Sequence, residues 1–145
     1  MSRLLLRTLV IVPLLSVLTS LGCTPPAAPE TAEVEPEAIA RTEFTERIEN
    51  FFEYTPLVAG EPSEFLIHLT DLVDGSPVFE GEVDLTVRPE GSGAETLTVR
   101  ALVGRVTGIY VAEVAIPQAG VYEIQFDVRA GDINETMRLG GFEVQ

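Results

Sequence analysis

The alternation in Val121-Tyr-Glu-Ile-Gln-Phe-Asp-Val-Arg129 decides the fold class. Every second residue from Tyr122 to Val128 is apolar, and the residues between them are polar or charged. Successive side chains of a strand point to opposite faces, so this pattern predicts a β-strand with one buried and one solvated face. The pattern does not fit the period of a helix.

The chain around this stretch has the same character. Six other segments alternate in the same way, with turn residues between them: 47–54, 64–70, 82–88, 96–101, 108–116 and 136–144. We expect 82–88 and 96–101 to pair as a hairpin. Seven short strands in roughly 100 residues predict an all-β, immunoglobulin-like β-sandwich at residues 44–145.

Two local features refine this prediction. Pro117-Gln-Ala-Gly-Val-Tyr122 has the form of a tyrosine corner, in which the tyrosine hydroxyl bonds to backbone a few residues upstream. The pair Gly140-Gly141 interrupts the last strand and predicts a bulge there.

The segment before the sandwich is organised around Cys23, the only cysteine. Two arginines flank or enter an apolar run from Leu4 to Leu18, which is the layout of a secretory signal. The sequence Ser20-Leu-Gly-Cys23 resembles the lipobox of bacterial lipoproteins, with its leucine one position later than usual. The resemblance implies that residues 1–22 are a signal peptide and that Cys23 carries lipid, including a fatty acyl chain such as palmitate.

Two other interpretations of this segment remain open. Residues 4–22 approach the length of an uncleaved membrane-spanning helix, and a cleaved signal could leave a free thiol at Cys23. Residues 23–43 are rich in proline and glutamate and predict a disordered linker. By the same resemblance, Thr24 after the lipidated cysteine favours the outer over the inner membrane, with the domain facing the periplasm.

Charge excludes one class of partner. All nine basic residues are arginines and 23 residues are acidic, so the formal net charge is −14. Removal of residues 1–22 would leave seven arginines and a net charge of −16. Binding to nucleic acid depends on cationic side chains that release counterions, so we expect no nucleic-acid partner.

Groups that could carry chemistry are few. His68 is the only histidine, and Met137 is the only methionine after the predicted signal. A metal site needs several converging ligands, so both are weak metal candidates, and a surface-facing histidine is the simpler interpretation of His68. No serine has the flanking pattern of a nucleophile elbow, and no glycine pair has phosphate-loop spacing. We therefore predict a protein without enzymatic activity or cofactor.

Acidic residues near strand ends give one more alternative. Asp71 with Asp74, and Asp127 with Asp132, could chelate calcium, although the spacing is not that of an EF-hand loop. Solvated acidic loops are the simpler interpretation.

The first part of the predicted domain contains the run Phe51-Phe-Glu-Tyr-Thr-Pro-Leu-Val-Ala-Gly-Glu-Pro-Ser-Glu-Phe-Leu-Ile-His-Leu-Thr-Asp-Leu72, between Phe44-Thr-Glu-Arg47 and Pro77-Val78. These residues resemble the N-terminal β-sandwich domain of periplasmic adaptor subunits of heavy-metal efflux pumps and, more loosely, YtkA-like envelope domains. Adaptors continue into hairpin, lipoyl and barrel segments without a counterpart here, and the methionine or histidine clusters of metal-handling members are absent. The resemblance implies the fold, the compartment and an association with envelope transport, but no metal site.

Two functions follow as hypotheses. The first is a lipid-anchored cell-envelope interaction module, associated with a metal or solute efflux system through an envelope transporter or adaptor protein. The alternative is a periplasmic metal- or solute-binding lipoprotein that uses His68, Met137 or loop carboxylates.

Overall fold

The computed structural model describes residues 37–92 and 97–145. The predicted signal peptide, Cys23 and most of the predicted linker lie outside these residues. The described residues form eight strands: β1 (Ile39–Phe44), β2 (Ile48–Tyr54), β3 (Pro62–Asp71), β4 (Glu82–Pro89), β5 (Leu97–Val103), β6 (Ile109–Ala115), β7 (Gly120–Ala130) and β8 (Ile133–Val144). No helix long and apolar enough to span a bilayer occurs among them.

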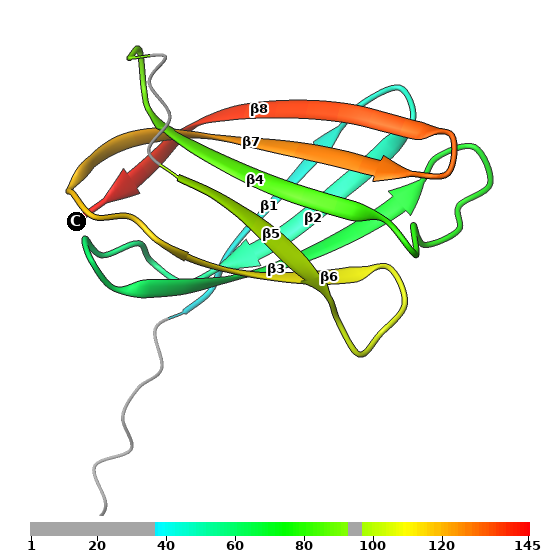
Figure 1. Cartoon of the computed structure of the whole chain (residues 1–145), viewed down its shortest axis with the longest axis horizontal. Coiled ribbons are helices and arrows are strands. Elements are labelled where there is room, and N and C mark those ends of the chain that lie inside the picture. Colours follow the sequence, from blue (N-terminus) through cyan, green and yellow to red (C-terminus); the bar gives the residue numbers. More distant parts are fainter. Residues whose placement is uncertain (1–36, 93–96) are drawn as a thin grey trace, which may run out of the picture. The chain divides into compact units, whose positions relative to one another are not determined.

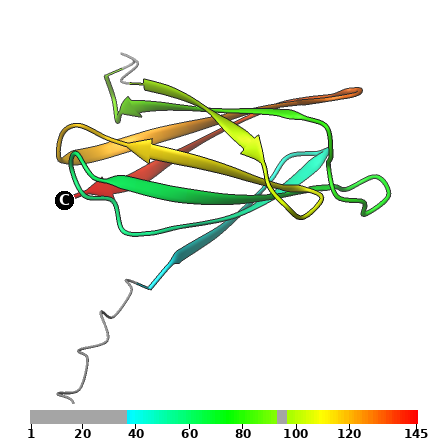
Figure 2. The ribbon, with the colours of Figure 1, turned by 60° about the horizontal axis from the view of Figure 1, so that its bottom comes forward.

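The strands form two antiparallel layers (Figures 1 and 2). Sheet A has the order β1-β2-β3-β6, and sheet B has the order β5-β4-β7-β8. The first part of β5 pairs with β4, whereas its last residues, Leu102 and Val103, pair with β6. Because β5 passes from one sheet to the other, all eight strands are connected in one hydrogen-bonded order.

This arrangement confirms the all-β sandwich. Strands β2-β3-β6 and β4-β7-β8 take the places of the two sheets of an immunoglobulin-like domain. The predicted hairpin between residues 82–88 and 96–101 is present as the β4–β5 pair. The number of strands is eight rather than seven among the described residues, because β1 occupies part of the stretch that we assigned to the linker.

The core lies between the layers and is rich in aromatic side chains. Phe52 of sheet A and Phe126 of sheet B meet across it, with ring centroids 4.9 Å apart. The alternation predicted the buried side of β3, β4 and β7 correctly, since the ten predicted core residues are all buried: Phe65, Ile67, Leu69, Val83, Leu85, Val87, Tyr122, Ile124, Phe126 and Val128. Burying one such side chain contributes about 1.5–3 kcal/mol, so this core is the main source of stability.

Both predicted local features are present. The Tyr122 hydroxyl donates a hydrogen bond to the Gln118 carbonyl oxygen at 3.0 Å, which is the tyrosine corner. The register of β7 against β8 shifts between Tyr122 and Ile124, opposite Gly140 and Gly141. Gly141 has a φ of 77°, a conformation that glycine adopts without strain, so the bulge falls where the sequence predicts it.

Arg41 closes the side of the sandwich between β1 and β8. It occupies a position of β1 that faces the core side, and its guanidinium carbon lies 4.7 Å from the Phe142 ring centroid. Its Nη1 donates to the Gly140 carbonyl oxygen at 3.0 Å, and its Nη2 contacts Glu43 at 3.2 Å. A charged side chain thus covers aromatic core residues and links the edge strands of the two sheets.

Candidate interaction surface

The structure does not bring the two weak metal candidates together. His68 lies on the outer side of β3 against the Phe51 ring, with centroids 5.2 Å apart, and its Nε2 is buried without a hydrogen-bond partner. Met137 lies on β8 of the other sheet and is buried in the core. Residues 37–92 and 97–145 contain no group of three histidine, cysteine, aspartate or glutamate side chains that could hold a metal.

The acidic candidates are engaged by neighbouring groups. Arg47, in the β1–β2 turn, donates through Nε and Nη2 to both carboxylate oxygens of Asp71, each at 2.9 Å. The same guanidinium donates to both oxygens of Asp132 at 3.1 Å. Arg47 therefore bridges Asp71 to Asp132, and Asp71 does not pair with Asp74 as the calcium alternative would require. The hydrogen bonds from Arg47, and then the one from the Val73 N–H, hold the pKa of the Asp71 carboxyl below its usual range.

The remaining two acidic candidates make local hydrogen bonds. Asp74 accepts the Ser76 N–H at 2.9 Å. Asp127 accepts from Gln125 Nε2 at 2.7 Å and from Thr136 Oγ1 at 2.6 Å. Asp74 thus stabilises its own loop and Asp127 the outer side of sheet B. Their arrangement gives no support to the alternative that these aspartates bind calcium.

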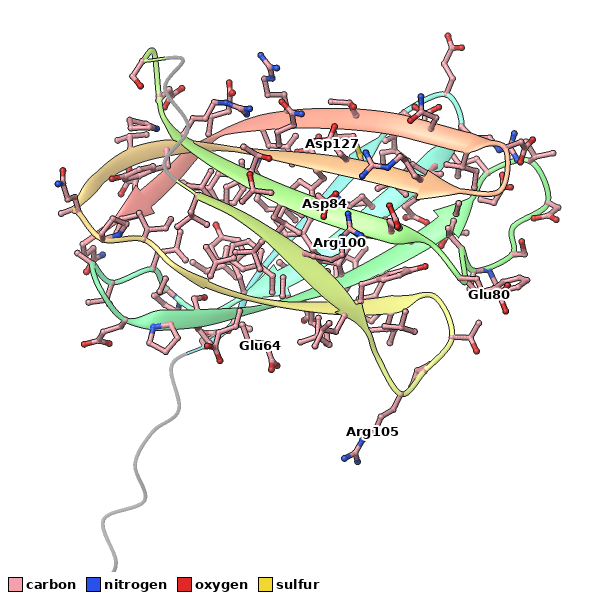
Figure 3. All side chains as sticks on the ribbon, in the orientation of Figure 1. Glu64, Glu80, Asp84, Arg100, Arg105 and Asp127 are labelled. Atoms are coloured by element: carbon pink, nitrogen blue, oxygen red, sulfur yellow. The ribbon has the colours of Figure 1, made fainter. Side chains whose placement is uncertain are left out.

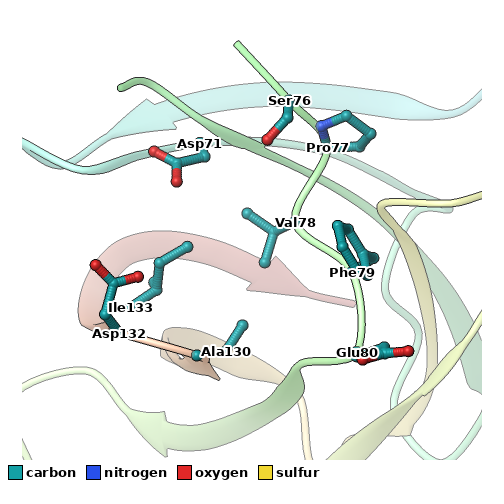
Figure 4. Close-up of a pocket in the computed structure, with 10 residues that line it drawn as sticks. Asp71, Ser76, Pro77, Val78, Phe79, Glu80, Ala130, Asp132 and Ile133 are labelled. Carbon is teal, nitrogen blue, oxygen red and sulfur yellow. The ribbon is translucent and has the colours of Figure 1, made fainter. Parts of the chain in front are cut away.

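A shallow hollow lies beside Asp71 and Asp132, the two aspartates that Arg47 binds. It has a volume of about 320 Å³ and lies between the β3–β4 loop and the β7–β8 turn (Figure 4). Asp71 and Asp132 line one side, and Phe79 and Glu80 line the loop side. Glu80 has a φ of 55°, which is uncommon for a residue other than glycine and costs roughly 1 kcal/mol or more. The hollow is open to solvent.

This hollow belongs to one end of the sandwich, which we call the loop end: the turns at 45–47, 72–81, 104–108 and 131–132 (Figure 1). Large apolar side chains in these turns, or at the strand ends next to them, are exposed to between 43% and 73% of their surface: Phe44, Leu72, Val73, Phe79, Val103 and Val106. The first described residues, including Ile39, lie at the opposite end, where Ile39 pairs with Tyr54. Exposed apolar side chains gathered in one region mark an interaction surface more often than scattered ones do.

Apolar side chains also lie on the outer side of sheet A. In register, Phe51 stands opposite His68, which stands opposite Ile109. The next row joins Leu66 to Val111 and Val111 to Leu102, which is 73% exposed. Five apolar residues next to His68 form what we call the apolar centre of the sheet A face, of which Leu102 is exposed and the others are half-buried: Phe51, Leu66, Leu102, Ile109 and Val111.

Glutamates surround this centre. Glu49 and Glu53 of β2, Glu64 of β3 and Glu113 of β6 point to the same side, as the alternation of each strand requires. Glu64 stands directly opposite Glu113 in the register of β3 and β6. None of the four is ion-paired with an arginine of residues 37–92 or 97–145. We call this set the glutamate rim.

The outer side of sheet B carries charges in a different arrangement. Asp84 and Asp127 also stand directly opposite each other. Arg100 donates to both oxygens of Asp84 at 2.8 and 3.0 Å, and Arg129 donates to it at 2.7 Å. These contacts, Arg100 first, hold the pKa of the Asp84 carboxyl below its usual range. Figure 3 shows Asp84, Arg100 and Asp127 together on sheet B, while Glu64 projects from the sheet A side.

Sequence reasoning did not find the glutamate rim. Its four acids lie on three strands between Glu49 and Glu113, and each alone looks like a solvated strand residue. Only the register of β3 against β6 places Glu64 opposite Glu113. The available signal was weaker: the outward positions of 47–54, 64–70 and 108–116 combine apolar residues with glutamate and contain no arginine after Arg47.

Comparisons with known proteins add little to this picture. No protein-family model matches the chain, and none of the curated proteins matches it. One X-ray crystal structure, provisionally described as a lipoprotein from Bacillus anthracis, is similar at 10% identity and a TM-score of 0.39. That match covers 70% of this chain and 83% of the other. The resemblance to adaptor subunits of efflux pumps stays a prediction.

Proposed function

We propose that this protein is a lipid-anchored, non-enzymatic interaction module of the bacterial cell envelope. Cys23 would carry the lipid, and the sandwich would face the periplasm, with the outer membrane favoured. The single observation that supports an interaction role is the set of exposed apolar side chains at the loop end and at Leu102 on the sheet A face. Leaving such side chains in water gains nothing for stability, whereas a partner that covers them would gain their burial.

The chemistry of the described residues also favours binding over catalysis. The loop-end carboxylates Asp71 and Asp132 are bound to Arg47. His68 is buried at Nε2 and contacts Phe51, so it is not presented as a general base to a cleft. General acid–base catalysis needs such a group within hydrogen-bond reach of a substrate site.

The anchor is tested by replacing Cys23 with serine in the full chain. We expect the wild-type protein in the membrane fraction and the Cys23→Ser variant outside it, because two or three acyl chains hold a soluble domain on a bilayer. Mass spectrometry of the mature N-terminus should find lipid on Cys23. A terminus that begins with unmodified Met1 would remove the anchor from this proposal.

The interaction role is tested by mild solubilisation of membranes and purification of the wild-type chain. We expect a protein of the envelope to be recovered with it in a fixed ratio, and a transporter component or adaptor would support the efflux association. Repeated recovery of this protein alone, at low and physiological salt, would contradict the interaction role. Calorimetric binding of copper, zinc or calcium would instead favour the alternative of a metal-binding lipoprotein.

A further inference from the structure

We propose that the outer face of sheet A is the docking surface and that its partner is a protein with an apolar centre bordered by arginine or lysine. This inference rests on the proposed interaction function and assigns it a surface and a partner chemistry. The apolar centre supplies area to bury, and the glutamate rim determines the charge of what can cover it.

The strongest evidence is the pair Glu64 and Glu113. Like charges directly opposite each other on neighbouring strands are unfavourable. On sheet B the equivalent pair, Asp84 and Asp127, is compensated, because Arg100 and Arg129 bind Asp84. Glu64 and Glu113 have no such arginine among residues 37–92 and 97–145. The described residues therefore supply no cation to this pair, and a basic side chain of a partner would relieve the repulsion.

A shallow hollow on the same face shows where one cation would fit. It has a volume of about 170 Å³, and Glu53, Glu64 and Leu66 line it together with Ala38, Tyr54 and Thr55. The side chain of lysine or arginine has an aliphatic stem and a charged end, so the stem would lie on Leu66 and the charge between Glu53 and Glu64. Leu66, which lines the hollow, also belongs to the row that it forms with Val111 and Leu102.

Two other occupants fit this face poorly. A second copy of the chain on a two-fold axis would bring glutamate rim against glutamate rim, and like-charge juxtaposition costs several kcal/mol. A bilayer with anionic lipids attracts basic segments and repels an acidic face. A basic-rimmed protein satisfies both the apolar centre and the rim.

The test is site-specific photocrosslinking of the full-length, membrane-anchored chain in its host. A photoreactive phenylalanine analogue replaces Leu102 on the sheet A face, Val121 on sheet B as the matched exposed position, or Val73 at the loop end. We expect a protein crosslink from Leu102 and none from Val121. Mass spectrometry of the crosslinked peptide should find arginine or lysine next to apolar residues in the partner.

Charge reversal then tests the chemistry. Glu64→Arg and Glu113→Arg should each reduce the Leu102 crosslink about tenfold or more, since charged groups across an interface carry that much binding energy. Glu143→Arg, an exposed change on β8, should leave the yield unchanged. Replacing the partner's crosslinked basic residue with glutamate should restore binding to the Glu64→Arg variant. Thermal melting of each variant shows whether the domain is still folded.

Each other outcome has a defined meaning. A Leu102 crosslink to a second copy, to lipid or to a segment without basic residues overturns the proposal, as does a crosslink that charge reversal does not change. Crosslinks from Val73 alone overturn the sheet A face and leave the interaction function standing. No crosslink from any position, with no partner after purification, overturns both.

Discussion

Both outer faces of the sandwich place two carboxylates directly opposite each other, and they treat the pair in opposite ways. On sheet B, Asp84 is held by Arg100 and Arg129. On sheet A, Glu64 and Glu113 stand opposite each other without a described arginine. The same repulsion is thus compensated inside the domain on one face and left uncompensated on the other.

The two sheets differ in the same direction elsewhere. The buried side-chain nitrogen and oxygen atoms that lack a hydrogen bond in the described residues are Asn50 Nδ2, Asn50 Oδ1 and His68 Nε2, and both residues belong to sheet A. On sheet B the buried Thr86 hydroxyl is bonded to Thr98 Oγ1 at 3.0 Å. The buried polar side chains of sheet B therefore find their partners within the domain, whereas sheet A keeps unsatisfied groups that a stability argument alone does not explain.

The largest expected change in stability comes from removing Asp84, the carboxylate that Arg100 and Arg129 bind on sheet B. Asp84→Ala should reduce the free energy of unfolding by about 2 kcal/mol, because a half-buried carboxylate with charged hydrogen bonds is removed from Arg100 and Arg129. Urea unfolding at neutral pH measures this. An unchanged midpoint would mean that the arginines on sheet B do not stabilise the fold and that the two faces are equivalent.

The second expected effect has the opposite sign and lies in sheet A. Asn50 is fully buried and has no partner at either amide atom. Asn50→Leu should raise the free energy of unfolding by about 1 kcal/mol, since an unsatisfied buried polar group is replaced by an apolar one of similar size. Ser63→Ala is the control, because Ser63 is buried but bonded to Thr55, and it should destabilise the domain. If Asn50→Leu also destabilises it, the amide has a partner such as a bound water.

Protonation of Asp84 at low pH should reproduce, reversibly, part of the destabilisation that Asp84→Ala causes. The pKa of Asp84 is lower in the folded domain than in the unfolded chain, so its contribution is complete above about pH 4 and is lost as the pH falls through the lowered value. Asp71 and Asp74 contribute in the same direction. The stability of Asp84→Asn should therefore fall less steeply than that of the wild type below about pH 4, as measured by unfolding at several pH values. Equal slopes would contradict a special role for the sheet B contacts.

The smallest expected effect is on the glutamate rim. Glu113→Arg turns a like-charge pair into an opposite-charge pair with Glu64 and should stabilise the domain by about 0.5 kcal/mol at low salt, less at high salt. Differential scanning calorimetry in both conditions measures it, with Glu143→Arg as the control. If Glu113→Arg is more stable but no longer binds the partner, the repulsion between Glu64 and Glu113 serves binding and not folding. If Glu113→Arg is less stable, the two glutamates do not repel each other measurably.

The sequence was sufficient for features that depend on local pattern. Alternation predicted the buried side of β3, β4 and β7, and two local patterns predicted the tyrosine corner at Tyr122 and the bulge at Gly140 and Gly141. It missed β1, because two of the three core-side positions of that strand hold Arg41 and Glu43, and only Ile39 is apolar. Arg41 is accepted there only because β8 supplies Phe142 and the Gly140 carbonyl, a contact 99 residues away in the chain.

The candidate surface depended on long-range register in the same way. Whether Glu64 meets an arginine or another glutamate is decided by the alignment of β3 with β6, and the two residues are far apart in sequence. His68 and Met137 attracted attention as rare residue types, yet one lies on an outer face and the other in the core. Rarity in composition therefore identified neither the apolar centre nor the glutamate rim.

The position of β1 has a mechanical consequence. Its residue nearest the start of the described chain, Ile39, pairs with Tyr54 at the end of the β1–β2 hairpin, and the turn lies at the other end. A force that pulls Glu37 away from the domain would break the backbone hydrogen bonds between β1 and β2 one after another, beginning at Ile39. It would not load all of them at the same time. The first residues of β1 would therefore detach at low force, and the contacts of Arg41 with Phe142 and Gly140 would oppose further detachment. Strands β2 to β8 would stay folded and carry the force.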